Sequence, residues 1–153
     1  MAHPALVVAA IVGIGVAAYK LFSDKKRVFV SYYYREDRRY KDLLSAWSAN
    51  KQFEFEFDDV SADISTRSED DGAIKRVLSQ KIREADVLLV LVGQKSHRRR
   101  WIQWEVTKAK QLRKRIVAVK IRSEYQSPKA LLASGATWAR SFEFKAIKAA
   151  MES

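Results

Sequence analysis

The stretch "VLLVLV" (Val87–Val92) is apolar at every position, so both faces of the segment that it forms are expected to be buried. A strand with one solvated face alternates apolar and polar residues, whereas a central strand of a parallel sheet reads as a continuous run of Val, Leu and Ile. The run is also as short as a strand and too short for an ordinary helix. We therefore predict a central parallel strand here, with the rest of the domain built around it.

Strands and helices alternate on both sides of this run. Further strands are predicted at Arg27–Ser31, Phe53–Phe57 and Ile116–Ile121. The segment Phe53–Phe57 alternates strictly, which is typical of a strand with one wet face at a sheet edge. The tail is expected to hold a short helix from Pro128 to about Gly135, a short strand within Thr137–Phe142 and a last helix to about Met151.

The segments between the strands repeat apolar residues at the spacing of a helix, three and four positions apart. A third helix is expected over about Arg99–Arg113, and a capping box of Ser68 and Asp71 marks the start of the second. The predicted apolar faces of the first two helices are Tyr40, Leu43, Leu44 and Trp47, and Ile74, Val77, Leu78 and Ile82. This alternation predicts an α/β fold, a doubly wound, flavodoxin-like parallel sheet covered by helices on both faces.

The first residues differ in kind from this domain. From Pro4 to Phe22 the only charge is Lys20, and basic residues cluster after the run. About 17–20 apolar residues are enough to span a bilayer, and by the positive-inside rule the basic flank stays in the cytoplasm. We predict a transmembrane helix within residues 1–24, with the N-terminus outside, followed by one domain at residues 25–153. Ala9, Gly13 and Ala17 recur every four residues, which suggests self-association of this helix and hence a homo-oligomer.

The composition of the chain limits the classes of partner that it can bind. The net charge is +11, but the basic residues are dispersed except for Lys25–Arg27 and Arg98–Arg100. Such a balance suits nucleic acid, anionic lipid or a phosphate-bearing small molecule. We find no nucleic-acid-binding motif and no glycine-rich phosphate loop, so we predict no nucleic-acid partner. The chain has no cysteine and only two histidines, so we predict no disulfide and no metal site.

Glu105 lies in an unusual setting, within "RRRWIQWEV" (Arg98–Val106). On a helix of about 100° per residue, Glu105 falls on the face that carries Ile102 and Val106 towards the sheet. A carboxylate on an inner face is costly unless it is paired or lines a binding site. Glu105 is therefore a candidate catalytic residue. Two structural explanations remain: the carboxyl is exposed to solvent where the helix extends beyond the sheet, or it forms an ion pair with a nearby arginine.

The pattern as a whole resembles a TIR domain, specifically the TIR-like subunit of bacterial Thoeris antiviral systems. The resemblance rests on segments that together span nearly all of residues 27–153, in family order: "RVFVSYYYREDRRYKDLLSAW", "FEFEFDD", "AIKRVLSQKIREADVLLVLVG", "RRRWIQWEVTKAKQLRKRIVAVKI" and "LLASGATWARSF". Enzymatic TIR domains cleave NAD at the nicotinamide–ribose bond, using a glutamate in a W-x-x-x-E stretch on the third helix. Here that stretch is Trp101–Glu105, so the resemblance assigns the catalytic role to Glu105.

The resemblance also implies partners and a setting. NAD would be the substrate, with no bound cofactor, and the product would be linear ADP-ribose or a cyclic ADP-ribose isomer. That nucleotide would be a signal made after a phage-derived trigger and read by a separate effector protein. With the predicted anchor in the lipid bilayer, the protein would sit in the bacterial inner membrane with its TIR-like domain in the cytoplasm.

Further substrate-binding candidates follow the first strand and open the third helix. Ser31, Tyr32 and Tyr33 are expected to wall the site, with either tyrosine stacking on nicotinamide, and Trp101 to shield it. Ordinary loop and core packing is the alternative for all four. For the whole chain, a non-catalytic TIR-like scaffold that recruits a partner at the membrane remains the alternative function. A receiver-like phosphoacceptor domain would need an acidic pair directly after the first strand, which is absent.

Overall fold

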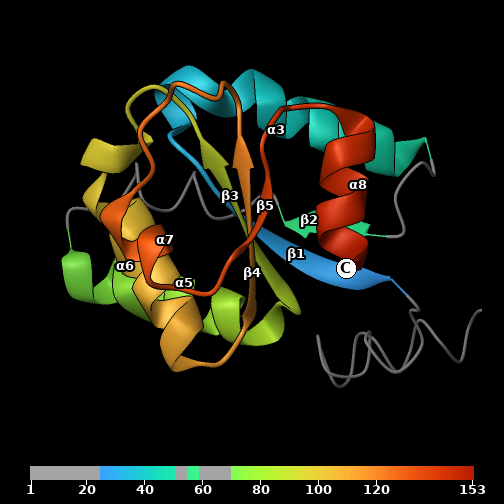
Figure 1. Cartoon of the computed structure of the whole chain (residues 1–153). Helices are drawn as coiled ribbons and strands as arrows, with labels where there is room; N and C mark the ends of the chain where they lie inside the picture. Colours follow the sequence, from blue (N-terminus) through green and yellow to red (C-terminus); the bar gives the residue numbers. More distant parts are fainter. Residues whose placement is uncertain (1–24, 51–54, 59–69) are drawn as a thin grey trace, which may run out of the picture.

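The computed structural model describes residues 25–50, 55–58 and 70–153 and shows a sheet with helices on both faces (Figure 1). Its strands are β1 (Lys26–Ser31), β2 (Phe55–Asp58), β3 (Val87–Val92), β4 (Arg115–Lys120) and β5 (Thr137–Ala139). Its helices are α3 (Tyr34–Ala49), α5 (Asp71–Glu84), η1 (Ser96–Arg98), α6 (Arg100–Gln111), α7 (Lys129–Leu132) and α8 (Phe144–Glu152). Each strand and helix predicted for residues 25–153 is present in the described chain, with ends shifted by a few residues.

The sheet is parallel and five-stranded, in the order β2-β1-β3-β4-β5. This order confirms the predicted flavodoxin-like doubly wound topology and places β2 at an edge, as its alternation indicated. All residues of the central strand β3 are buried. The order reverses direction between β1 and β3, which makes this pair the topological switch point, where open α/β sheets bind ligands beyond the carboxyl ends of their strands.

Two apolar clusters cover the two faces of the sheet. On one face, Leu44 of α3 and Ile147 and Met151 of α8 pack against β1, β3 and β4. On the other face lie the apolar stripes of α5, α6 and α7, against the alternate residues of the same strands. Figure 1 shows α5, α6 and α7 grouped on one side of the sheet and α8 on the other. Burial of each large aliphatic side chain in these layers stabilises the fold by about 1.5–3 kcal/mol.

Two predicted helix faces need correction. Leu43 is 44% exposed and Val77 is 37% exposed, so neither belongs to its helix's inner face. The buried residues of α3 are Asp37, Lys41 and Leu44, at spacings of four and three. Tyr40, Leu44 and Trp47 of the predicted face do pack against the core, so only Leu43 is wrong there, and hydrophobic periodicity missed the two charged side chains that this helix also buries.

The start of α5 is capped by a residue other than the predicted one. The side chain of Asp70 accepts hydrogen bonds from the backbone N–H groups of Gly72 (2.9 Å) and Ala73 (3.3 Å). Asp71, the predicted partner of Ser68, is instead the first residue of the helix, and Ser68 lies outside the described residues. A carboxylate at the N-cap position satisfies two of the free donors at the helix end.

The predicted membrane anchor at residues 1–24 lies outside the described residues. Within the described part of the chain, no helix has the length and apolar character needed to cross a bilayer.

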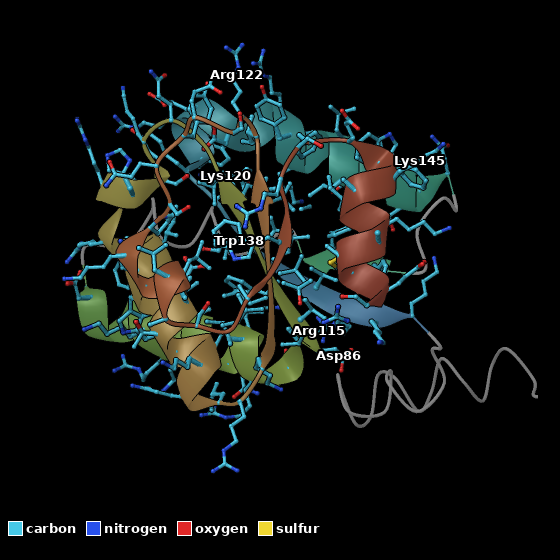
Figure 2. All side chains as sticks on the ribbon, viewed as in Figure 1. Asp86, Arg115, Lys120, Arg122, Trp138 and Lys145 are labelled. Carbon is cyan, nitrogen blue, oxygen red and sulfur yellow. The ribbon has the colours of Figure 1, made fainter. Side chains whose placement is uncertain are left out.

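One arginine joins the end of the chain to the sheet. Arg115, the first residue of β4, donates hydrogen bonds to the carbonyl oxygens of Met151 (2.7 Å) and Ala150 (2.6 Å) in the last turn of α8. It also reaches the hydroxyl of Ser153 at 3.1 Å. Figure 2 labels Arg115 beside the carboxyl end of that helix. A cation here satisfies carbonyls that the helix leaves unpaired and complements the helix dipole.

Replacing Arg115 with methionine should destabilise the domain by about 1.5–3 kcal/mol, the usual contribution of hydrogen bonds from a charged group. Urea unfolding followed by circular dichroism measures the change. The matched control is Arg122→Met, because Arg122 is exposed and its guanidinium has no partner in the described chain. Equal stability of the two variants would contradict a role for Arg115 in holding α8.

Candidate active site

Glu105 lies on the inner face of α6, where the sequence placed it. The buried residues of this helix are Ile102, Glu105, Val106 and Ala109, so Glu105 does share its face with Ile102 and Val106, as predicted. Only 7% of Glu105 is exposed, so the carboxyl is not on a wet overhang of the helix. Nor does it form an ion pair with any described residue, and its Oε2 atom is buried without a hydrogen-bond partner there. Neither solvent exposure nor an ion pair with a described residue therefore explains this side chain.

Ser31 faces Glu105 from the end of β1. Side chains alternate along a strand, so Ser31 lies on the same face of the sheet as Phe29, which packs in the cluster with α6. Ser31 is buried, and its hydroxyl is near enough to the carboxyl to lower the pKa of Glu105. The Ser31 hydroxyl and the Glu105 carboxyl do not form a full hydrogen bond, since Oγ of Ser31 also has no partner among the described residues.

Burial dominates the protonation of Glu105. Removal from water disfavours the charged form and raises the pKa of the carboxyl to about 8, against the smaller lowering by Ser31. At neutral pH the carboxyl therefore holds its proton more often than not. An unpaired carboxyl with such a pKa at the end of a central strand is the kind of group that functional sites contain.

The two candidate tyrosines lie on opposite faces of the sheet. Tyr33 packs against the cluster that contains α6, on the side of Glu105, whereas Tyr32 packs against the cluster of α3 and α8. One face of the Tyr33 ring is covered by the guanidinium of Arg99, 4.3 Å from the ring centroid. Of the two, Tyr33 is therefore the better placed to contact a ligand beside Glu105.

Trp101 is half-buried one turn before Glu105 on α6. Its ring meets that of Trp104 edge-on at 5.9 Å, and Arg100 lies over it at 5.0 Å. Arg100 in turn donates two hydrogen bonds to the carboxylate of Asp71 at the start of α5, at 2.9 and 3.0 Å. Packing of this kind fixes the first turn of α6; contact of Trp101 with a ligand stays a prediction.

A second buried carboxyl lies at the same edge of the sheet and was missed from the sequence. Asp37, in the first turns of α3, is only 5% exposed, and its Oδ2 atom has no hydrogen-bond partner in the described chain. Its carboxyl packs directly on Gly93, the residue that follows β3. The signal for it was present, because Asp37 precedes the buried Leu44 by seven residues, two helical turns.

The loop after β1 and the loop after β3 are tied together around these groups. Lys95 forms an ion pair of 2.6 Å with Glu36, and Arg99 stacks on Tyr33. Within the second loop, the Ser96 hydroxyl accepts a hydrogen bond from the Gly93 N–H (2.8 Å) and donates one to the Leu91 carbonyl (3.1 Å). The partly buried His97 beside it has a buried Nδ1 atom that finds no partner in the described chain. Ser31, Asp37, His97 and Glu105 thus place unpaired polar atoms at one switch point.

Metal chemistry has no cluster of ligands to build on among the described residues. No three His, Asp or Glu side chains converge there in a way that could hold a metal ion.

The fold and the site define a flavodoxin-like α/β domain with buried carboxyl groups at its switch point. The chain belongs to the family described as "Thoeris protein ThsB, TIR-like domain", which matches residues 29–126. That span includes Ser31, Asp37 and Glu105, and the match confirms the resemblance drawn from the sequence. No match is found among curated proteins.

One solved structure supports the fold. One similar structure is that of the Clostridium botulinum CMP N-glycosidase BcmB, with a TM-score of 0.53 and 15% identity over 83% of this chain and 97% of that one. Another is that of the TIR domains of the activated Roq1 resistosome recognizing the pathogen effector XopQ, with a TM-score of 0.44 and 19% identity over 63% and 57% of the two chains. The TM-score of the second structure is too low to carry an argument, and at 15% identity the first supports the fold alone.

The raised pKa of Glu105 predicts that its protonation affects folding. The folded state keeps the proton up to about pH 8, whereas the unfolded chain loses it near pH 4.5, the ordinary value. The stability that this group contributes is therefore complete below about pH 4.5 and is lost as pH rises towards 8. Relative to Glu105→Gln, the wild type should lose on the order of 3–4 kcal/mol between about pH 5 and pH 8.

Urea unfolding of both proteins at the two pH values measures this difference. Glu124→Gln is the matched control. Glu124 is exposed, so this variant should lose the same stability as the wild type between the two pH values. A difference between wild type and Glu105→Gln that is the same at both pH values would mean that Glu105 is ionised in the folded protein.

Proposed function

We propose that this protein is an enzyme that breaks the N-glycosidic bond between nicotinamide and ribose in NAD, with Glu105 as its catalytic residue. The observation that carries the proposal is a buried carboxyl with an unpaired oxygen at the switch point of a TIR-like domain. Keeping such a group costs folding free energy, and within the described chain the Ser31 hydroxyl offsets only a small part of that cost. A bound ligand that interacts with the carboxyl would offset this cost.

The chemistry of the bond explains why a carboxyl is useful. Departure of nicotinamide leaves a ribose with the character of an oxocarbenium ion, as in glycoside cleavage. A carboxylate close to that ring stabilises the cation most strongly where water is scarce. The leaving group is a neutral base, so the enzyme needs no strong acid to assist its departure.

The pKa of about 8 is compatible with this role because the substrate is charged. The pyridinium ring of NAD carries a positive charge, which favours the ionised form of a neighbouring carboxyl. Binding of NAD would therefore draw the proton from Glu105 and supply the carboxylate when it is needed. Ser31 and Tyr33, on the same face, are the residues that we propose to contact the ribose and nicotinamide, with Trp101 shielding them.

The setting that we propose follows the Thoeris family. The nucleotide product, ADP-ribose or a cyclic isomer of it, would be a signal released after a phage-derived trigger and bound by a separate effector protein. The apolar stretch within residues 1–24 would anchor a homo-oligomer in the bacterial inner membrane, with the TIR-like domain in the cytoplasm. The alternative is a scaffold without catalysis, in which Glu105 would serve only to bind a partner.

Glu105→Gln should lower nicotinamide release from NAD by about 100-fold or more, the usual cost of losing a group that stabilises charge in the transition state. The assay uses the full chain in detergent, alone and with extract of phage-infected cells, and measures nicotinamide by chromatography. The glutamine variant keeps the size of the side chain, and Glu124→Gln should retain full activity as the control.

Two outcomes would contradict the proposal. A glutamine variant that turns over as fast as the wild type would remove Glu105 from the mechanism. A wild type that releases no nicotinamide under either condition would leave the scaffold as the better account of this chain.

A further inference from the structure

We propose that Asp37 is a second catalytic carboxylate of this site, the base that takes the proton from the hydroxyl group that attacks the ribose. This inference rests on the proposed function of Glu105 and adds a residue to it. It is carried by the position of Asp37 against Gly93, by its burial and by the absence of any partner for its carboxyl in the described chain.

The pairing of Asp37 with Gly93 shows that the site is built to hold a carboxyl. A Cβ atom at position 93 would collide with both carboxyl oxygens of Asp37. Gly93 does not adopt the left-handed backbone that usually calls for glycine. Glycine is thus required here for space alone, so two positions are committed to keeping this carboxyl at the end of β3.

The ordinary structural uses of a buried aspartate do not apply to Asp37. Its side chain does not cap α3, because no backbone N–H bonds to its oxygens and the helix start has no side-chain cap. The ion pair with the neighbouring loop is made instead by Glu36, with Lys95. A buried carboxyl that neither caps a helix nor pairs with a cation costs free energy, as Glu105 does.

The two carboxyls come from helices on opposite faces of the sheet. Asp37 is on α3, which packs with α8, and Glu105 is on α6, which packs with α5. Asp37 packs on Gly93, directly after β3, and Glu105 lies beside Ser31, the last residue of β1. These two strands are neighbours at the switch point. Two carboxyls that approach a glycosidic bond from two sides can divide the work, one stabilising the cation and the other activating the attacking group.

The charge states of the two groups suit that division. Burial raises the pKa of Asp37 to about 6; the neighbouring Glu36 adds to this rise and Arg39 opposes it. The buried Lys41, one turn further along α3, is not among the charges that hold this pKa down. Asp37 is therefore mostly ionised near pH 7, as a general base must be.

The proposed step is balanced without any further reactant than water or a hydroxyl of the same nucleotide. The bond between C1′ and the pyridinium nitrogen breaks, and its electron pair leaves with nicotinamide. The oxygen of the acceptor forms the new bond to C1′, and its proton passes to Asp37. Glu105 stays ionised beside the ribose throughout.

The test compares Asp37→Asn with the wild type in nicotinamide release by the full chain, over about pH 5 to pH 9. Because both carboxyls must be ionised, log kcat/KM of the wild type should fall with slope one below about pH 8 and slope two below about pH 6. The variant should keep slope one from about pH 8 down to pH 5 and be about 100-fold slower near pH 7.5. His97→Gln, which keeps both carboxyls, should retain the steep limb.

Azide provides a readout that a purely structural role would not move. It attacks as an anion with no proton to lose, so it should raise nicotinamide release by Asp37→Asn about 10-fold or more and form the ribosyl azide. It should leave Glu105→Gln slow. Gly93→Ala, which displaces the same carboxyl, should also be slow, and the double variant with Asp37→Asn no slower than either.

The outcomes separate this inference from the proposed function. If the wild type is active and Glu105→Gln is not, but Asp37→Asn keeps the steep limb or gains nothing from azide, Asp37 is not the base and the role of Glu105 stands. The loss of the steep limb in His97→Gln would likewise overturn the assignment to Asp37. An inactive wild type, or an active Glu105→Gln, would instead refute the proposed function.

Discussion

The burial of the Glu105 carboxyl against the end of β1 is the constraint on which the rest of the site depends. The apolar residues that share its helix face, Ile102, Val106 and Ala109, press α6 onto the sheet and carry Glu105 inward with them. The Ser31 hydroxyl lowers the pKa of this carboxyl, but it only partly offsets the loss of water. The free energy of packing thus outweighs the cost of burying this carboxyl, which is how proteins maintain strained functional groups.

The neighbouring loops are arranged so that this edge of the sheet stays rigid. The Glu36–Lys95 ion pair and the Arg99–Tyr33 stack join the loops after β1 and β3, and Ser96 ties the second loop to its own strand. The two ion-paired side chains are partly exposed, so solvent screens the pair and it contributes little stability. Its effect is positional, since groups held on fixed loops need less reorganisation when a substrate binds.

The sequence predicted the features that rest on apolar pattern. The continuous run of β3 and the stripe of α6 gave the fold and the inward direction of Glu105, because packing of apolar side chains decides both. Asp37 was missed because α3 buries two charged residues, which a hydrophobic pattern counts as outside. Gly93 carried no signal by itself, since its requirement for space arises only when α3 meets the end of β3. The predicted strand ended at Ser31, as the observed one does, so continuing its alternation would have placed Tyr32 and Tyr33 on opposite faces.

The most direct test of this account is the titration of the Glu105 carboxyl itself, followed by carbon NMR of carboxyl-labelled protein with Glu105→Gln to assign the signal. The account predicts a single carboxyl that titrates near pH 8 in the free protein and shifts to lower pH when NAD binds beside it. A Glu105 signal that titrates near pH 4.5, unchanged by NAD, would contradict the buried, ligand-facing acid on which the proposed chemistry is built.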